Sequence, residues 1–210
     1  MKRSGNLIVV TAPSGTGKTT IIRRILAEMD GIEFSVSHTT RPARTGESHG
    51  RDYFYVDRDE FARMVEDHAF YEWAEVFGKY LYGTSRAFVD SRLAEGVDVL
   101  LDIEVQGALQ IKRSVPRAVL IFLLPPSFDE LQDRIARRNL DAPAEIRKRL
   151  ETARKEIRLY NEFHHVIING ELESSVQAAK AVIGAARCRV PENEPLIREI
   201  LNTFEEDIHV

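Results

Sequence analysis

The sequence predicts an α/β protein built on a parallel β-sheet that helices cover on both faces. Apolar runs of strand length at 7–11, 97–103, 118–124 and 165–169 alternate with segments whose apolar residues recur at helical spacing. Runs that are apolar throughout are typical of strands buried on both faces, and alternation with helices indicates parallel pairing. A glycine-rich loop directly after the first run is the third observation.

Composition limits the class of protein before any motif is considered. The 210 residues are 43% hydrophobic and 30% charged, which is ordinary for a globular chain with one core and small appended lobes. The formal net charge of −4 argues against a basic nucleic-acid-binding protein. The run at 118–124 is too short to span a bilayer, and the start of the chain lacks a signal-peptide pattern. The lone Cys188, expected to be semi-buried, fits a reducing compartment, so we expect a cytoplasmic protein that binds neither membrane nor nucleic acid.

The elements of the main domain follow in order. The strand at 7–11 is β-branched and ends before Pro13 and the glycine loop. A helix is expected over 19–29, where large aliphatic residues recur at helical spacing. Further helices are expected between or after the other strands, at 85–96, 106–113, 127–138 and 171–187.

Two segments interrupt this alternation. Residues 34–84 carry aromatic, strand-like stretches and one helix, expected from Asp57 to about Asp67, that opens with Asp57 and Glu60 in capping-box spacing. This pattern predicts a small, mostly antiparallel inserted lobe. Residues 126–163 are rich in arginine and predict a helical segment in which Pro143 suits a first turn. Its apolar stripe keeps a 4-3-4-3 spacing through Ile146, Leu150, Ala153, Ile157 and Tyr160.

The expected division of the chain follows from these interruptions. The core comprises 1–33, 85–125 and 164–210, the lobe 34–84 and the arginine-rich segment 126–163. Near the end of the core, apolar residues at helical spacing predict a packed terminal helix: Leu196, Ile197, Ile200, Leu201 and Phe204.

The glycine-rich loop reads APSGTGKTT and lies between a predicted strand and a predicted helix, which is the context of a Walker A phosphate loop. Inward-facing N–H groups and the positive end of the helix dipole bind phosphate oxygens there. Lys18 is expected to reach the β- and γ-phosphates, and Thr19 to offer its hydroxyl to Mg²⁺. Ala12 replaces the first glycine of the pattern and fits if its φ is negative. The expected ATP site comprises Ala12, Pro13, Ser14, Gly15, Thr16, Gly17, Lys18, Thr19 and Thr20.

Four further stretches carry a resemblance to a known family. They are SVSHTTRPARTGE at 35–47, GRDYFYV at 50–56, FYEWAEVFGKYLYGTS at 70–85 and LLDIEVQG at 100–107. With the phosphate loop they resemble guanylate kinase in order and separation, up to about residue 187. The resemblance implies a P-loop NTPase-type parallel sheet with helices on both faces, an inserted GMP-binding lobe and a helical lid. It also implies that the γ-phosphoryl group of ATP passes to GMP, giving ADP and GDP, with Mg²⁺ as cofactor.

The resemblance assigns residues to the acceptor phosphate. Arg41 and Arg44 match the arginines that hold the GMP phosphate, and Tyr53 and Tyr82 match phosphate-binding hydroxyls. The stretch GKYLYG has one residue more than the family's G-x-Y-Y-G, so Tyr80 could serve in place of Tyr82.

The resemblance also assigns a base-reading residue. Guanine presents two adjacent donors that one carboxylate accepts, whereas N1 of adenine is an acceptor. Glu72 matches the family's guanine-reading carboxylate, with Ser37, Thr84 and Asp102 as companions.

Cations of the lid complete the expected site. Arg138 and Arg149 match the arginines that close on the ATP phosphates, although Arg137 could replace Arg138, and Asn169 matches an adenine-side position. The side chains expected to stabilise charge during transfer are those of Lys18, Arg41, Arg138 and Arg149.

Two alternatives remain at this stage. A guanylate-kinase-like enzyme acting on ribose 1,5-bisphosphate would have no base to read, which Glu72 and the TTRPAR stretch count against. A guanylate-kinase-like binding module of the scaffold type would have a degraded phosphate loop, which Lys18 and Thr19 count against. The expected partners are ATP and GMP or dGMP.

Overall fold

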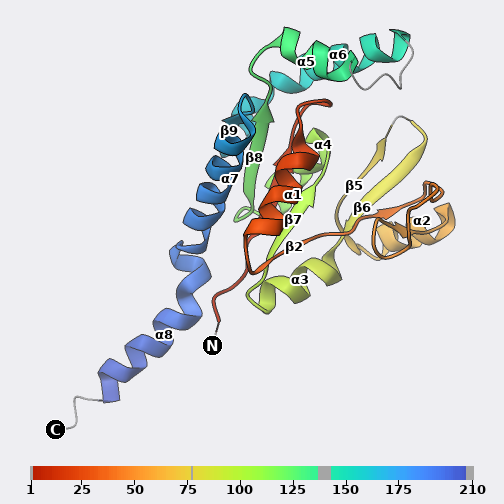
Figure 1. Cartoon of the computed structure of the whole chain (residues 1–210). Helices are drawn as coiled ribbons and strands as arrows, with labels where there is room; N and C mark the ends of the chain where they lie inside the picture. The colour runs from red at the N-terminus through yellow and green to blue at the C-terminus, as the bar shows by residue number, and fades with distance from the viewer. Residues whose placement is uncertain (1, 77, 137–142, 207–210) are drawn as a thin grey trace.

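The computed structural model describes residues 2–76, 78–136 and 143–206. Its main body is a parallel sheet of five strands in the order β2-β7-β1-β8-β9 (Figure 1), so the predicted fold class is confirmed. The strand β2 is absent from the sequence prediction, because three residues are too few to show a period. The strands are β1 Leu7–Thr11, β2 Ile32–Phe34, β7 Asp98–Asp102, β8 Val119–Leu124 and β9 His165–Ile168.

Helices cover both faces of this sheet. Ile8 and Val10 of β1 point into one hydrophobic cluster, with α1 and α7, while Leu7 and Val9 point into the other, with α3 and α4. All four side chains are almost fully buried, so β1 is the centre of the core. The helices are α1 Lys18–Glu28, α3 Arg86–Ala94, α4 Val105–Ser114 and α7 Leu172–Arg187.

The inserted segment forms a second sheet of four strands in the order β4-β3-β6-β5. The pair β3 and β4 is parallel, and the pairs β3–β6 and β5–β6 are antiparallel. Asp57 caps the lobe's helix by accepting from the backbone N–H of Glu60 at 2.7 Å, as its spacing predicts. Figure 1 shows this lobe to one side of the main sheet. Its elements are β3 His38–Thr39, β4 Phe54–Tyr55, α2 Arg58–Glu66, β5 Phe70–Val76 and β6 Tyr80–Ser85.

The arginine-rich segment forms two helices beyond the end of β8 (Figure 1), α5 Phe128–Ala136 and α6 Pro143–Ile157. Leu131 and Ile135 of α5 pack against the apolar stripe of α6. A short 3-10 helix, η1 Tyr160–Glu162, follows, and it places the side chain of Tyr160 in solvent rather than on the stripe.

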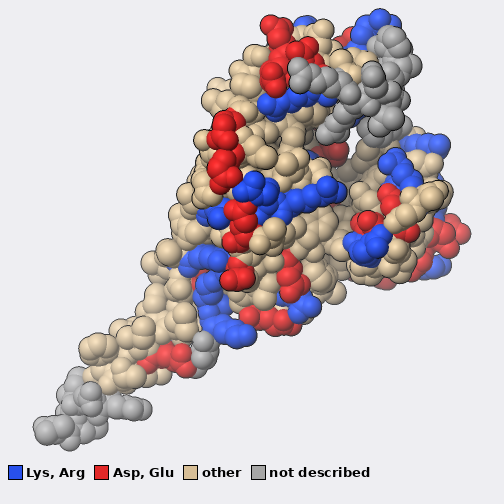
Figure 2. Space-filling view, viewed as in Figure 1, with Lys and Arg blue, Asp and Glu red and all other residues tan. Residues whose placement is uncertain are grey.

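The terminal helix α8 Val190–Glu206 forms, with Leu196 and Ile197 partly buried, but the prediction that it is packed is wrong for its second half. The side chains of Ile200, Leu201 and Phe204 are 57%, 55% and 68% exposed, because the helix projects away from the core (Figure 1) and is mostly uncharged on the face seen in Figure 2. An apolar period reports an amphipathic helix and does not report what covers it. The prediction for Cys188 is also wrong, since it ends α7 at the surface. No helix within the described ranges combines the length and apolar character needed to cross a bilayer.

Asp98, the first residue of the interior strand β7, joins that strand to the segment before β1 and to the end of α7. Its carboxylate is fully buried and accepts from Arg3 Nη1 and the Asn6 backbone N–H at 2.8 Å each, and from Arg187 Nε at 2.7 Å. Burial opposes ionisation, but these hydrogen bonds outweigh it and hold the pKa of Asp98 below its usual range.

The substitution Asp98→Asn should therefore destabilise the fold by roughly 2–4 kcal/mol at pH 7, since it leaves two partly buried guanidinium groups without their carboxylate. A lowered pKa gives stability that is present above the unfolded value and lost as pH falls through the folded one. Urea denaturation at pH 7 and pH 3 should show the difference shrinking in acid. Asp133→Asn, at an exposed position of α5, is the matched control. Equal unfolding free energies for Asp98→Asn and the control at pH 7 would contradict the anchoring role.

Candidate active site

The loop between β1 and α1 has the backbone of a phosphate-binding turn. Gly15 and Gly17 lie at φ 90° and 98°, where other residues are strained, and Gly17 caps the helix that begins at Lys18. Among the non-glycine residues described, only His68 has a positive φ, so Ala12 fits in place of the first glycine as predicted. The loop therefore leads into the N-terminus of α1, the positive end of a helix dipole, which is where phosphate groups bind.

Three residues outside this loop brace it. Asn169, just after β9, donates from Nδ2 to the carbonyl oxygen of Thr16 at 2.6 Å. Arg134 of α5 donates to the same oxygen and to the carbonyl of Asn169, both at 3.1 Å. Arg149 of α6 donates from Nη2 to the Ser14 hydroxyl at 2.7 Å. Helices α5 and α6 thus contact the phosphate loop directly.

Sequence reasoning placed only part of this bracing. Arg149 lies at the loop, whereas Arg138 and its alternative Arg137 lie outside the described residues. The contact made by Arg134 was missed, because nothing in its spacing distinguishes it from the other arginines of the lid. Thr19 and Thr20 lie at the surface in the first turn of α1.

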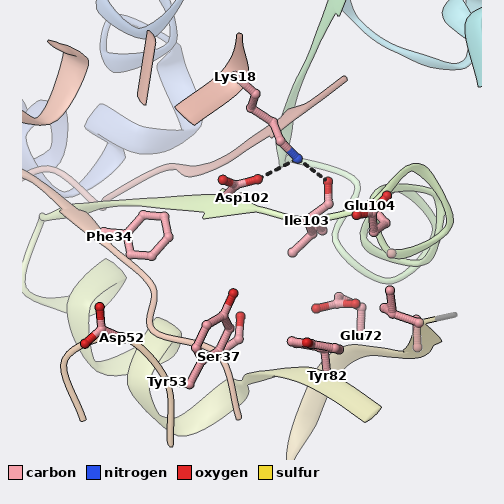
Figure 3. A pocket seen from close by; sticks show the side chains of 13 residues that line it. Lys18, Phe34, Ser37, Asp52, Tyr53, Glu72, Tyr82, Asp102, Ile103 and Glu104 are labelled. Carbon is pink, nitrogen blue, oxygen red and sulfur yellow. Dashed lines mark hydrogen bonds and ion pairs between the residues drawn. The ribbon is translucent and has the colours of Figure 1, made fainter. Parts of the chain in front are cut away.

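Lys18 reaches from the loop to the end of the neighbouring strand β7. Its Nζ is 2.5 Å from Asp102 Oδ1 and donates to the carbonyl oxygen of Ile103 at 3.2 Å (Figure 3). The register that pairs Val10 with Asp102 explains this contact, because parallel neighbours end at the same edge of a sheet.

A cavity of about 260 Å³ opens beside this ion pair, between the main sheet and the lobe (Figure 3). Six residues predicted from the sequence line it: Lys18, Ser37, Tyr53, Glu72, Tyr82 and Asp102. Seven lining residues were not predicted: Phe34, Asp52, Ala74, Val76, Ile103, Glu104 and Gly107. Ala74 and Val76 follow Glu72 at alternate positions of β5 and so share its face, which is the signal that could have identified them.

Glu72 lies at one end of this cavity. It is 5% exposed, and its Oε1 accepts from the Thr84 hydroxyl at 2.6 Å. Burial raises the pKa of Glu72 to about 7, because the hydroxyl alone does not offset desolvation of the charged form. Gly107 of α4 leaves room for the carboxylate, since a Cβ there would lie 2.5 Å from Glu72 Oε2. The next residue, Trp73, is tied to α4 through Gln110, which donates to its carbonyl oxygen at 2.9 Å.

The arginine side of the lobe adjoins the tyrosines. Arg41 is 8% exposed, and its Cζ lies 5.2 Å from the centre of the Tyr53 ring, which lies 5.7 Å from that of Tyr82. Burial raises the pKa of Tyr53, so this hydroxyl remains a donor. Arg41 thus contacts a tyrosine that lines the cavity but does not line the cavity itself, and Arg44 lies at the surface.

The extra residue in GKYLYG is absorbed without a bulge in β6. Tyr80 pairs with Val76 at the tip of the β5–β6 hairpin, whereas Tyr82 pairs with both Ala74 and Thr39. Tyr82 therefore faces Tyr53 in the cavity wall, and Tyr80 does not line it.

Because the pKa of Glu72 is raised, its ionisation should destabilise the fold. Between pH 4.5, the ordinary pKa of the group, and about pH 7, the folded state keeps the Glu72 carboxyl protonated whereas the unfolded state does not. The free energy of unfolding therefore falls as pH rises through that window. Glu72→Gln should remove this loss and raise the melting temperature at pH 8 relative to wild type, with little difference at pH 4.5. Glu75→Gln, at an exposed position of the same strand, is the control. Identical pH profiles for Glu72→Gln and wild type would refute the raised pKa.

Comparison with known proteins agrees with this geometry. The profile of the guanylate kinase family matches residues 4–186. The chain is 42% identical over 200 residues to a guanylate kinase of Caldanaerobacter subterraneus, covering 95% of this chain and 97% of the relative. It is 50% identical over 185 residues to that of Thermus thermophilus, covering 88% and 83%. The crystal structure of guanylate kinase from Anaplasma phagocytophilum superposes with a TM-score of 0.74 at 33% identity, covering 91% of this chain and 90% of that one. This chain belongs to the guanylate kinase family.

Proposed function

We propose that this chain transfers the γ-phosphoryl group of ATP to GMP, giving ADP and GDP, and so serves purine nucleotide metabolism. The observation that carries the proposal is the buried carboxylate of Glu72, which shares one cavity with the phosphate-loop lysine, Lys18. Family membership supports it. We also propose that the enzyme acts in the cytoplasm, where both nucleotides are available.

Glu72 and its neighbours suit the base of the acceptor. An ionised carboxylate accepts N1–H and the 2-amino group of guanine together, and the hydroxyl of Thr84 fixes its orientation. Ser37 and Asp102 line the same cavity and are placed to meet other edges of the nucleoside. Adenine would set its N1 lone pair against the carboxylate, so AMP should be a poor acceptor.

We propose that the acceptor phosphate binds beside Arg41 and Arg44 of the lobe. A phosphate is already an anionic nucleophile, so no general base is needed, and the task is to bring two anions together. Arg41 and Arg44 supply positive charge there, and the hydroxyls of Tyr53 and Tyr82 supply donors. We assign this role to Tyr82 rather than Tyr80, because only Tyr82 lies in the cavity wall.

We propose that the donor nucleotide binds at the phosphate loop, residues 12–20, and the lid. Lys18 must exchange Asp102 for phosphate oxygens when ATP binds, and Arg149 already reaches the loop at Ser14. Arg138 is proposed as the second lid cation on family resemblance alone. Asn169 is proposed for the adenine side; in this structure its side chain holds the Thr16 carbonyl.

The residues beside the loop fit a magnesium ion that arrives with ATP. Within the described ranges, no group of three His, Cys, Asp or Glu side chains is arranged to hold a metal. Mg²⁺ is commonly held by phosphates of the substrate and water together with one or two protein oxygens. We propose that the Thr19 hydroxyl is the protein ligand, at the end of α1 that adjoins Lys18 and Asp102. The bound ion would neutralise charge on the transferring phosphates.

We further propose that the chain works as three parts. Residues 1–33, 85–125 and 164–210 form the catalytic core, 34–84 the GMP-binding lobe and 126–163 the lid. The Lys18–Asp102 pair lies within the core, while the cavity lies between core and lobe, so lobe movement would open and close it.

Acceptor specificity tests the function. In a coupled assay of ADP release with ATP and Mg²⁺, GMP should be phosphorylated at least about 10³-fold more efficiently than AMP. Lys18→Ala should lower kcat by about 10²-fold or more with an unchanged melting temperature. Ribose 1,5-bisphosphate is the second comparison acceptor. Preference for it would favour the sugar-phosphate enzyme, and no turnover with any acceptor would favour the binding module.

The pH dependence of the Michaelis constant tests the role of Glu72. Since only the ionised carboxylate accepts both guanine donors, KM for GMP should rise by about tenfold per unit as pH falls below about 7. The GMP phosphate also titrates, with a pKa of about 6. The profile of Glu72→Gln isolates that contribution, because it retains only the titration of the phosphate. Superimposable wild-type and variant profiles would exclude Glu72 as the base-reading group.

A further inference from the structure

The carboxylate of Glu47 accepts hydrogen bonds from three residues around it, Arg41, Arg44 and Tyr55. Glu47 Oε1 accepts from Arg41 Nη2 at 2.9 Å. Its Oε2 accepts from the backbone N–H of Arg44 at 2.8 Å and from the Tyr55 hydroxyl at 2.9 Å. A single side chain therefore joins the guanidinium of one arginine, the backbone of the other and strand β4.

These contacts fix the guanidinium of Arg41 in one orientation. Its Nη1 donates to the carbonyl oxygen of Pro42 at 2.8 Å, and its Cζ lies 5.2 Å and 5.9 Å from the ring centres of Tyr53 and Tyr55. A guanidinium carries five N–H donors, and Glu47 and Pro42 take one on each terminal nitrogen. The Arg41 side chain also hydrogen-bonds with Tyr82, so three partners hold the group in place and its five donors are not all used.

The charge of Glu47 is permanent over the working range. The hydrogen bond from Arg41, followed by that from the Arg44 N–H, lowers the pKa of Glu47 to about 2. An ionised carboxylate beside a phosphate site repels the phosphate, so its presence needs a compensating benefit. Two arginines against one carboxylate leave a net positive charge, and the carboxylate orders a long side chain before the ligand arrives.

We propose that Glu47 is a positioning residue for the acceptor phosphate, holding the Arg41 fork and the Arg44 backbone in the geometry that receives it. The inference rests on the proposed function, because it takes the ligand of Arg41 and Arg44 to be the phosphate of a nucleoside monophosphate. Glu47 acts through the arginines and does not line the cavity that Glu72 occupies.

The test compares binding of GMP with binding of guanosine, which has the base and no phosphate. By isothermal titration calorimetry, Glu47→Gln should raise the Kd for GMP by about tenfold or more and change that for guanosine by less than about twofold. Tyr55→Phe removes one of the three contacts and should weaken GMP by a smaller factor, again without effect on guanosine. Glu75→Gln, at an exposed position of the same lobe, should change neither.

Two results would overturn the inference. Equal weakening of GMP and guanosine by both Glu47→Gln and Tyr55→Phe would show that these groups support the whole lobe. Unchanged GMP binding in Glu47→Gln would show that the arginines need no brace. The proposed function is judged separately, by wild-type turnover of GMP, so a protein that binds GMP in this way without phosphorylating it would retain the inference and lose the function.

Discussion

The contact between Lys18 and Asp102 joins the two halves of the site. Lys18 opens the helix after the phosphate loop, and Asp102 ends β7 and lines the acceptor cavity. Their separation of 2.5 Å follows from the parallel pairing of β1 with β7, which brings a helix start and a strand end to one edge. In the proposed reaction, Lys18 leaves Asp102 to bind the phosphates of ATP, and the carboxylate of Asp102 becomes available to the acceptor. Occupation of one half therefore changes the charge presented to the other.

Charge is distributed unevenly along the cleft. The cavity wall carries one lysine and four carboxylates, on Asp52, Glu72, Asp102 and Glu104, and none of the described residues that line it is an arginine. A pocket lined with cations would bind any anion, so in the proposed function this division separates recognition of the base from attraction of phosphate. The role proposed for Glu72 requires that no arginine lies beside it, because a guanidinium next to the buried carboxylate would compete with the donors of guanine.

Sequence reasoning succeeded where a signal is local. The apolar runs and the glycine loop have fixed periods or spacings, so the parallel sheet and the loop geometry were predictable. It failed where a role depends on contacts between distant segments. Gly107 is confined by Glu72, and Arg134 meets Thr16, yet neither has a neighbour in sequence that reveals this. The exposed face of α8 is the converse case, since its period predicts a helix and says nothing about its partner.

The position of Trp73 on β5 makes it useful for spectroscopy. It is the one tryptophan of the chain, 42% exposed, and directly follows Glu72 on β5. Strand alternation turns its indole away from the cavity, toward Phe61 of α2, whose ring centre is 6.5 Å away. An indole that is partly exposed, belongs to the lobe and does not line the cavity suits fluorescence measurements of lobe movement. The protein thus carries an intrinsic emission probe one residue from Glu72, the carboxylate proposed to read the acceptor base.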